Sequence, residues 1–229
     1  MQCIIPIAGP DFYSPDYGIK PLFEVDGVPL LYKSVTSRPW WDAGIVTDKD
    51  LIFALKESNH LSQFKSQLLD WFPRCRVITY SEFTTGALGS CFGAIPLLRD
   101  DDLLCIDLVD ILYSMGINQM LHYFDLLTGS CVGLVPFFHS QDPCFSYLKV
   151  NEKLEICSVS EKSVTSCKAS VGTYIFRNPQ TFILGVYSSF TGRYLPPYIT
   201  SVLNALVQQD LRILAVPVDE PNPLSLIFH

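Results

Sequence analysis

The chain has 229 residues, 48% of them hydrophobic, and a formal charge of -7. This length and composition suffice for one substantial buried core, so we expect a single domain over residues 1–229. The 16 Lys and Arg residues form no basic stripe, which argues against a nucleic-acid partner, although an acidic protein can still bind a small phosphorylated ligand.

The N-terminal residues lack the basic flank and long apolar run of a signal peptide, and no stretch approaches the roughly 18 apolar residues of a membrane span. We therefore expect a cytoplasmic protein with no membrane partner. Eight cysteines are scattered without a C-x-x-C pair, and we expect them to be reduced core residues.

Five apolar runs have the length and the Ile, Val, Leu and Cys content of strands that are buried on both faces. They cover residues 3–7, 76–80, 103–106, 131–135 and 212–218. Segments with helical spacing lie among them, at residues 30–35, 61–71 after a cap at Ser58, 86–98 and 199–206. The more polar region 137–168 is suited to a small β-rich insertion.

This alternation of strands and helices predicts an α/β fold of the three-layer, Rossmann-like kind. We expect a mixed, mostly parallel sheet with helices on both faces. In such folds the ligand site lies at the carboxyl ends of the strands, which directs attention to the loops after Ile7, Tyr80 and Ile106.

The first of these loops follows the strand at residues 3–7 and contains Ala8, Gly9, Pro10 and Asp11, and the chain then reaches Lys20-Pro21-Leu22. Small residues let backbone N–H groups approach a nucleotide, and a lysine ammonium offsets the charge of its phosphates. An ordinary strand-to-helix turn with a solvated lysine is the alternative interpretation.

The second loop contains Thr85, Gly86 and Ala87, just before a predicted helix. Small residues at this place let a nucleobase lie against the backbone, although close packing of a helix on a sheet explains the same composition.

The third loop carries Asp107 and Asp110 after the strand at residues 103–106. A carboxylate at the carboxyl end of a strand, facing a phosphate site, suits Mg²⁺, which takes one or two carboxylates together with phosphate oxygens and water.

Two further segments complete the set. Glu161-Lys162 precedes the run Ala169-Ser170-Val171-Gly172-Thr173-Tyr174, and Asp219 follows the last predicted strand. An exposed ion pair and a turn aspartate are their plainer interpretations.

In this order, the segments resemble those of the sugar-nucleotide pyrophosphorylases, a family of nucleotidylyltransferases. The resemblance implies that Asp110, and not Asp107, binds Mg²⁺, with Asp219 as a second ligand in a looser match. It implies catalytic roles for Lys20, Asp110 and Lys162, and it implies substrate binding by Ala8, Gly9, Pro10, Asp11, Thr85, Gly86, Ala87, Glu161 and Gly172.

The expected protein is thus a Mg²⁺-dependent enzyme that joins a nucleoside triphosphate to a sugar phosphate, or to a related phosphate or phosphonate, and releases pyrophosphate. No general base is needed, which agrees with the absence of any recognisable histidine motif. Many members of the family associate, so a homo-oligomer is a family-level expectation.

One departure from the family matters. Its usual loop reads G-x-G-x-R, whereas residues 9–19 contain no basic side chain here, and the arginine that clamps pyrophosphate is missing. Two alternatives therefore stay open. One is a non-catalytic regulatory homologue that binds a nucleotide or sugar nucleotide, and the other is a metal-dependent glycosyltransferase of related fold, against which the Lys-Pro-Leu and Glu-Lys segments count.

Overall fold

The computed structural model describes residues 1–9, 12–16, 18–58, 60–82, 84, 86–129, 131–190 and 194–223, apart from the side chains of Glu220 and Pro223. Within these ranges, no helix has both the length and the apolar character needed to cross a bilayer.

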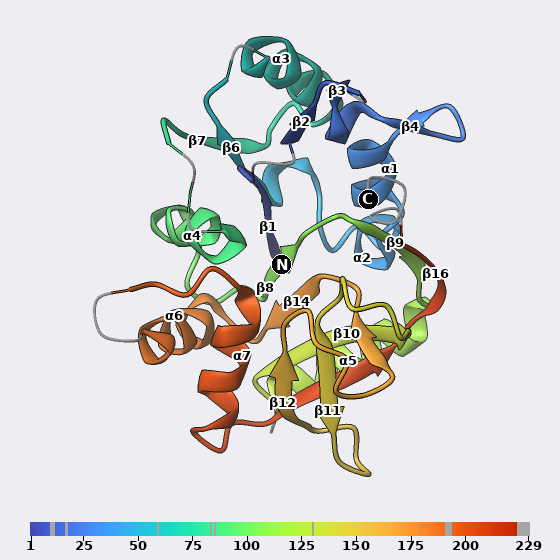
Figure 1. Cartoon of the computed structure of the whole chain (residues 1–229), viewed down its shortest axis with the longest axis vertical. Coiled ribbons are helices and arrows are strands. Elements are labelled where there is room, and N and C mark those ends of the chain that lie inside the picture. The colour runs from blue at the N-terminus through green and yellow to red at the C-terminus, as the bar shows by residue number, and fades with distance from the viewer. Residues whose placement is uncertain are drawn as a thin grey trace.

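A ten-stranded sheet runs through the molecule in the order β12-β11-β13-β10-β14-β8-β1-β6-β7, with β15 paired to β10 (Figure 1). The strands are β1 (Gln2–Ile7), β6 (Leu51–Lys56), β7 (Arg76–Tyr80), β8 (Leu104–Asp107), β10 (Gly133–His139), β11 (Tyr147–Val150), β12 (Ile156–Ser160), β13 (Lys168–Ser170), β14 (Thr173–Phe176) and β15 (Ile213–Pro217).

The sheet is mixed. Strands β7, β6, β1 and β8 pair in parallel, as do β10 and β15. Strands β14, β13 and β12 run against their neighbours. The half of the sheet from β8 to β7 is therefore parallel, and the antiparallel strands begin with β14 in the middle and continue to the β12 edge.

Helices cover both faces of this sheet. The core cluster on one face includes side chains from α1 (Leu30–Thr36), α2 (Pro39–Asp42), α3 (Leu61–Trp71) and α5 (Ile117–Thr128). The cluster on the other face includes side chains from α4 (Gly86–Phe92), α6 (Pro179–Ser189) and α7 (Ile199–Val207).

Strand β1 shows why the sequence takes this form. Its side chains alternate between the two core clusters: Cys3 and Ile5 pack on one face of the sheet and Ile4 on the other. Fully burying an aliphatic side chain of this size contributes about 1.5–3 kcal/mol, so a continuous apolar run is what a two-sided strand requires.

Several short elements complete the fold. Among the described residues they include β2 (Tyr13–Ser14), β3 (Gly18–Ile19), β4 (Glu24–Val25), β5 (Val28–Pro29), β9 (Ile111–Ser114), β16 (Asp219–Pro223) and the 3₁₀ turns η2 (Lys20–Leu22), η3 (Asp48–Asp50) and η4 (Ile95–Leu97).

The predicted fold class is confirmed, with corrections in its details. The polar region 137–168 is β-rich as expected, and its strands β11 and β12 extend the main sheet instead of forming a separate one. The third predicted helix ends early, at Phe92, and Pro96 then lies in a 3₁₀ turn. Helix α3 begins after His60, so Ser58 is not its cap.

The sequence did not reveal β6, α5 or α6. The cysteines also differ in burial, although all eight were expected to lie in the core. Cys3, Cys91, Cys105 and Cys131 are buried and unpaired, whereas Cys157 and Cys167 are exposed and therefore lie outside the core.

Candidate active site

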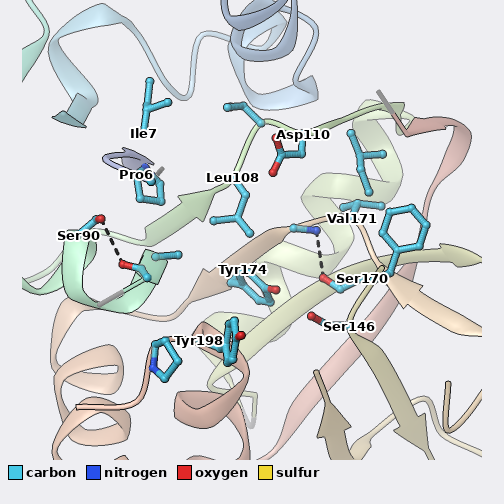
Figure 2. Close-up of a pocket in the computed structure, with 18 of the residues that line it drawn as sticks. Pro6, Ile7, Ser90, Leu108, Asp110, Ser146, Ser170, Val171, Tyr174 and Tyr198 are labelled. Carbon is cyan, nitrogen blue, oxygen red and sulfur yellow. Dashed lines mark hydrogen bonds between the residues drawn. The ribbon is translucent and has the colours of Figure 1, made fainter. Parts of the chain in front are cut away.

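A cavity of about 840 Å³ opens beside the carboxyl ends of β1 and β8 (Figure 2). Gly9 after β1, Thr84 before α4, Gly86 at the start of α4, and Leu108 to Asp110 after β8 contribute to its wall. These are the three loops that the sequence singled out. The volume lies within the range of about 300–1,000 Å³ that is usual for small-molecule sites.

Lys20 and Asp110 meet in the wall of this cavity. The distance from Lys20 Nζ to Asp110 Oδ1 is 3.0 Å, and the side chains are 17% and 39% exposed. Lys20 opens the 3₁₀ turn η2, where Pro21 follows it and fixes the backbone. The structure thus places two of the predicted catalytic residues in direct contact.

The loop that carries Asp110 has a constrained backbone. Val109 adopts a positive φ of 57°, which side chains with a branched Cβ rarely accept. Leu108 N–H donates to the carbonyl of Gly172 at 2.9 Å. Gly172 itself has a φ of 78°, and a Cβ there would lie 3.2 Å from Leu108 Cβ, so both conformation and space favour glycine.

A buried ion pair lies behind this loop. Arg38 donates from Nε to Asp107 Oδ2 at 2.6 Å and from Nη2 to Asp107 Oδ1 at 2.9 Å. The guanidinium also lies 4.2 Å from the centre of the Tyr113 ring. Burial acts to lower the pKa of Arg38, but the attraction of Asp107 outweighs it and raises the pKa, so the guanidinium stays charged.

Sequence reasoning missed Arg38, because a lone arginine between two short helices belongs to no motif. The family resemblance favoured Asp110 over Asp107 as the metal ligand. The geometry agrees, since Asp107 is 2% exposed and directed at Arg38.

The first turn of α4 is held tightly against the segment before α7. Gly86 has a φ of 70°, and a Cβ there would come within 2.3 Å of the Pro197 carbonyl oxygen. Leu88 N–H donates to the same oxygen at 3.2 Å. Gly86 and Ala87 line the cavity from this fixed turn.

Hydroxyl groups surround the carboxylate of Glu161 on another wall. Ser146 donates to Glu161 Oε2 at 2.8 Å and Thr200 donates to the same oxygen at 3.2 Å. Tyr174 lies beside them, and burial raises the pKa of its hydroxyl to about 12, with the nearby carboxylate of Glu161 adding to the rise. Lys162 follows with a positive φ of 49° and also lines the cavity.

Most of the predicted site residues that the structure describes line this one cavity, although they come from distant parts of the chain. They are Gly9, Lys20, Gly86, Ala87, Asp110, Glu161, Lys162 and Gly172. Ala8 is buried next to Gly9. Pro10, Asp11 and Thr85 lie outside the described residues.

Asp219 is not brought to the cavity. It is exposed at the start of β16, where it pairs with Ser114, while the far end of β16 pairs with Ile111. The antiparallel register therefore puts Asp219 at the end of β9 remote from Asp110, and the expected sharing of one metal by both carboxylates has no support in this geometry.

The residues present nevertheless fit a magnesium ion. In the described part of the chain no three His, Cys, Asp or Glu side chains lie together, so there is no site made of protein ligands alone. Mg²⁺ does not need one, because it commonly keeps several waters and binds one or two carboxylates plus substrate phosphates. The half-exposed Asp110, facing a cavity large enough for a triphosphate, meets that requirement.

Comparisons with known proteins find similarity in structure only. No family model and no curated protein matches the sequence. Among solved structures, the chain is similar to a nucleoside-diphosphate-sugar pyrophosphorylase from Vibrio cholerae, with a TM-score of 0.73 and 15% identity over 96% of this chain and 93% of that one. The protein therefore has the fold of the sugar-nucleotide pyrophosphorylases, the family that its motifs resemble.

Two further solved structures have a similar fold. One is a UDP-glucose pyrophosphorylase complexed with UDP-glucose, with a TM-score of 0.71 and 15% identity over 99% of this chain and 94% of that one. The other is the inositol-1-phosphate CTP transferase from T. maritima, with a TM-score of 0.73 and 15% identity over 96% and 86% of the two chains.

Proposed function

We propose that this protein is a nucleotidylyltransferase that joins a nucleoside triphosphate to a small phosphorylated acceptor and releases pyrophosphate. The observation that carries the proposal is one cavity with Lys20 and Asp110 on one wall and Glu161 and Lys162 on another. Each wall thus pairs a lysine with a carboxylate. One pair can serve the triphosphate and the other the acceptor.

In the proposed reaction, an oxygen of the acceptor phosphate attacks the α-phosphorus of the triphosphate in line. The new O–P bond forms as the bond to the β-phosphate oxygen breaks, and pyrophosphate leaves with the electron pair. Because no covalent intermediate is involved, the protein contributes position and electric field.

Lys20 neutralises the leaving pyrophosphate in this scheme. In the structure its ammonium contacts Asp110, so it is already held at the place where phosphates would arrive. It also bears the task alone among residues 9–20, since no other basic side chain occurs in that segment.

Asp110 is the proposed ligand of a magnesium ion, which when bound would spread the negative charge that develops on the phosphates. Lys20 would then turn from Asp110 to the phosphate oxygens. Before substrate binds, Lys20 therefore pairs with the Asp110 carboxylate. This contact avoids the cost of partly burying that carboxylate without a partner.

Gly86 and Ala87 form the surface against which the nucleobase lies, because the fixed turn exposes backbone without bulky side chains. Glu161 accepts hydrogen bonds from acceptor hydroxyls, and Lys162 orients the acceptor phosphate. Ser146 and Thr200 hold the Glu161 carboxylate in place for this role.

The direct test is a pyrophosphate-release assay. Purified protein with Mg²⁺ is offered each common nucleoside triphosphate together with a panel of sugar 1-phosphates, polyol phosphates and phosphonates. Release of pyrophosphate in at least one combination is the expected result.

The same assay separates the alternatives. Silence with every pair, combined with tight nucleotide binding and a stable protein partner, would instead identify a regulatory homologue. Release of a nucleoside diphosphate from a nucleotide sugar would identify a glycosyltransferase.

A further inference from the structure

Both neighbours of Asp110 are tied to one short segment of the chain. Ser34, in α1, donates from Oγ to the Val109 carbonyl at 3.0 Å. Arg38, four residues later, donates from Nη1 to the Ile111 carbonyl at 3.0 Å. The backbone on each side of the carboxylate is therefore fixed from behind by side chains outside the cavity.

Asp107 is the second anchor of the loop. Its Oδ1 accepts from the Val109 N–H at 3.0 Å and from the Thr173 hydroxyl at 3.3 Å, while Arg38 occupies both carboxylate oxygens. Arg38 and Asp107 are 1% and 2% exposed. The positive φ of Val109 is thus maintained by a closed set of contacts.

Stability alone does not explain this pair. Replacing a buried ion pair with apolar residues of similar volume is often neutral or stabilising, because taking two charges out of water costs as much as their attraction returns. What the pair offers is geometry. A bidentate guanidinium–carboxylate contact with a third hydrogen bond to Ile111 allows one arrangement of the loop.

We propose that Arg38 and Asp107 are positioning residues for Asp110. They hold the loop at residues 107–111 so that the Asp110 carboxylate stands at the metal position before the nucleotide arrives. This inference rests on the proposed function, because it assumes that Asp110 binds the metal. Groups behind a ligand commonly change metal affinity or activity by about 10- to 100-fold.

The decisive variant is the double replacement Arg38→Met with Asp107→Leu. It removes the fork and the anchor of Val109 while leaving no unpaired charge in the core, so the fold has a route to remain stable. A matched control is Arg74→Met with Asp48→Leu. That pair has an Arg Nη2 to Asp Oδ1 distance of 2.6 Å but lies at the opposite end of the strands, with Arg74 66% exposed.

The measurement is binding of Mn²⁺ in the presence of each common nucleoside triphosphate, followed by electron paramagnetic resonance. For the buried double variant we expect the Mn²⁺ dissociation constant to rise about 10- to 100-fold. The control variant should bind as the parent does. Unchanged Mn²⁺ binding in a folded buried double variant would overturn the proposal.

If the buried double variant does not fold, a milder variant still tests the proposal. Ser34→Ala removes only the tie to the Val109 carbonyl, and we expect the Mn²⁺ dissociation constant to rise several-fold, on the order of one broken hydrogen bond. Parent-like binding by Ser34→Ala would also count against positioning. Failure of the parent to bind any Mn²⁺–nucleotide would instead reject the proposed function itself.

Discussion

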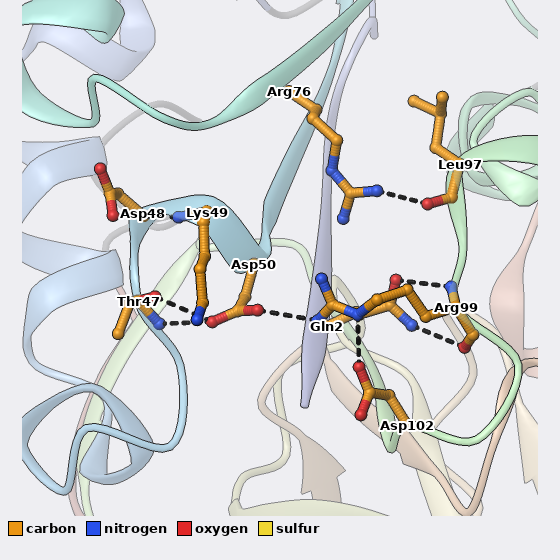
Figure 3. Close-up of polar contacts among 9 residues, drawn as sticks. All are labelled: Gln2, Thr47, Asp48, Lys49, Asp50, Arg76, Leu97, Arg99 and Asp102. Carbon is orange, nitrogen blue, oxygen red and sulfur yellow. Dashed lines mark hydrogen bonds and ion pairs between the residues drawn. The ribbon is translucent and has the colours of Figure 1, made fainter.

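Charged side chains gather at both ends of the parallel strands, but the two ends differ in what those side chains face. At the amino ends, Asp50 accepts from Arg99 Nη2 at 2.8 Å and Arg99 Nε contacts Asp102 at 2.6 Å (Figure 3). The side-chain amide of Gln2, in β1, exchanges two hydrogen bonds with the Arg99 backbone, at 2.8 and 2.9 Å.

At the carboxyl ends, the buried pair Arg38–Asp107 supports a loop whose own charge, Asp110, faces a cavity. The contacts described at the amino ends join these side chains to one another and to the backbone around them. In an open α/β sheet the loops at the carboxyl ends splay apart and leave a crevice. The difference teaches that ion pairs near the two ends of the strands differ in what they support: contacts among themselves at the amino ends, and a loop beside a cavity at the carboxyl ends.

The largest expected effect comes from breaking the buried pair on one side only. Asp107→Asn leaves the Arg38 guanidinium uncompensated in the core, and we expect a loss of about 3–5 kcal/mol in the free energy of unfolding. Urea denaturation of parent and variant measures this. A loss under about 1 kcal/mol would mean that water reaches Arg38, and the contrast between the two ends would weaken.

Asp110→Asn should have the opposite profile. We expect turnover to fall about 100- to 1,000-fold, because an electrostatic contact to the reacting phosphates is lost, while the thermal melt stays near that of the parent. Initial rates of pyrophosphate release and a melting curve test both halves. Unfolding of this variant would show Asp110 to be structural.

Glu161→Gln tests the acceptor wall. The amide keeps the shape of the side chain but removes the charge that strengthens hydrogen bonds from substrate, a change of about 1.5–3 kcal/mol for a bond to a charged group. We expect kcat/KM for the acceptor to fall about 10- to 100-fold, with little change in nucleotide KM. An equal rise in both KM values would place Glu161 nearer the nucleotide.

The smallest effect is expected at the amino ends and depends on pH. Burial acts to raise the pKa of Asp50, but hydrogen bonds from Thr47 and Arg99 outweigh it and hold the pKa below its usual value. A lowered pKa means that the stability contributed by Asp50 is fully present above about pH 4, the ordinary pKa of an aspartate, and is lost as the pH falls below that value and through the lowered pKa of the folded protein.

Asp50→Asn should therefore cost about 1–2 kcal/mol at pH 7 and flatten the loss of stability in acid, with pyrophosphate release unaffected. Denaturation curves at pH 7 and pH 3 measure it. A large fall in turnover would show that the two ends of the strands are coupled.

The local signals in the sequence carried much of this picture. β7 was predicted with its observed bounds, and the strand-tip position of Asp110 followed from its place after an apolar run. Lys20, Glu161 and Lys162 were predicted as site residues because each lies in a short segment that resembles a family motif, and all three line the cavity. These features depend on neighbouring residues, which a sequence displays directly.

The features that were missed depend on contacts between distant segments. Arg38 gains its role only because Asp107 and Ile111, about seventy positions later, fold against it. Asp219 was placed beside the metal because it follows the last strand of the sheet. That strand, β15, pairs with β10 rather than β8, so its end lies away from Asp110. The spacing of residues within a segment does not determine which strands pair with one another.

A crystal of the protein soaked with a nucleoside triphosphate and Mg²⁺ tests the central claim most directly. The account predicts a metal bound to a carboxylate oxygen of Asp110 at about 2.0–2.1 Å and to phosphate oxygens, with Lys20 turned from Asp110 toward the phosphates. A nucleotide bound outside the cavity, or a metal held without Asp110, would contradict it.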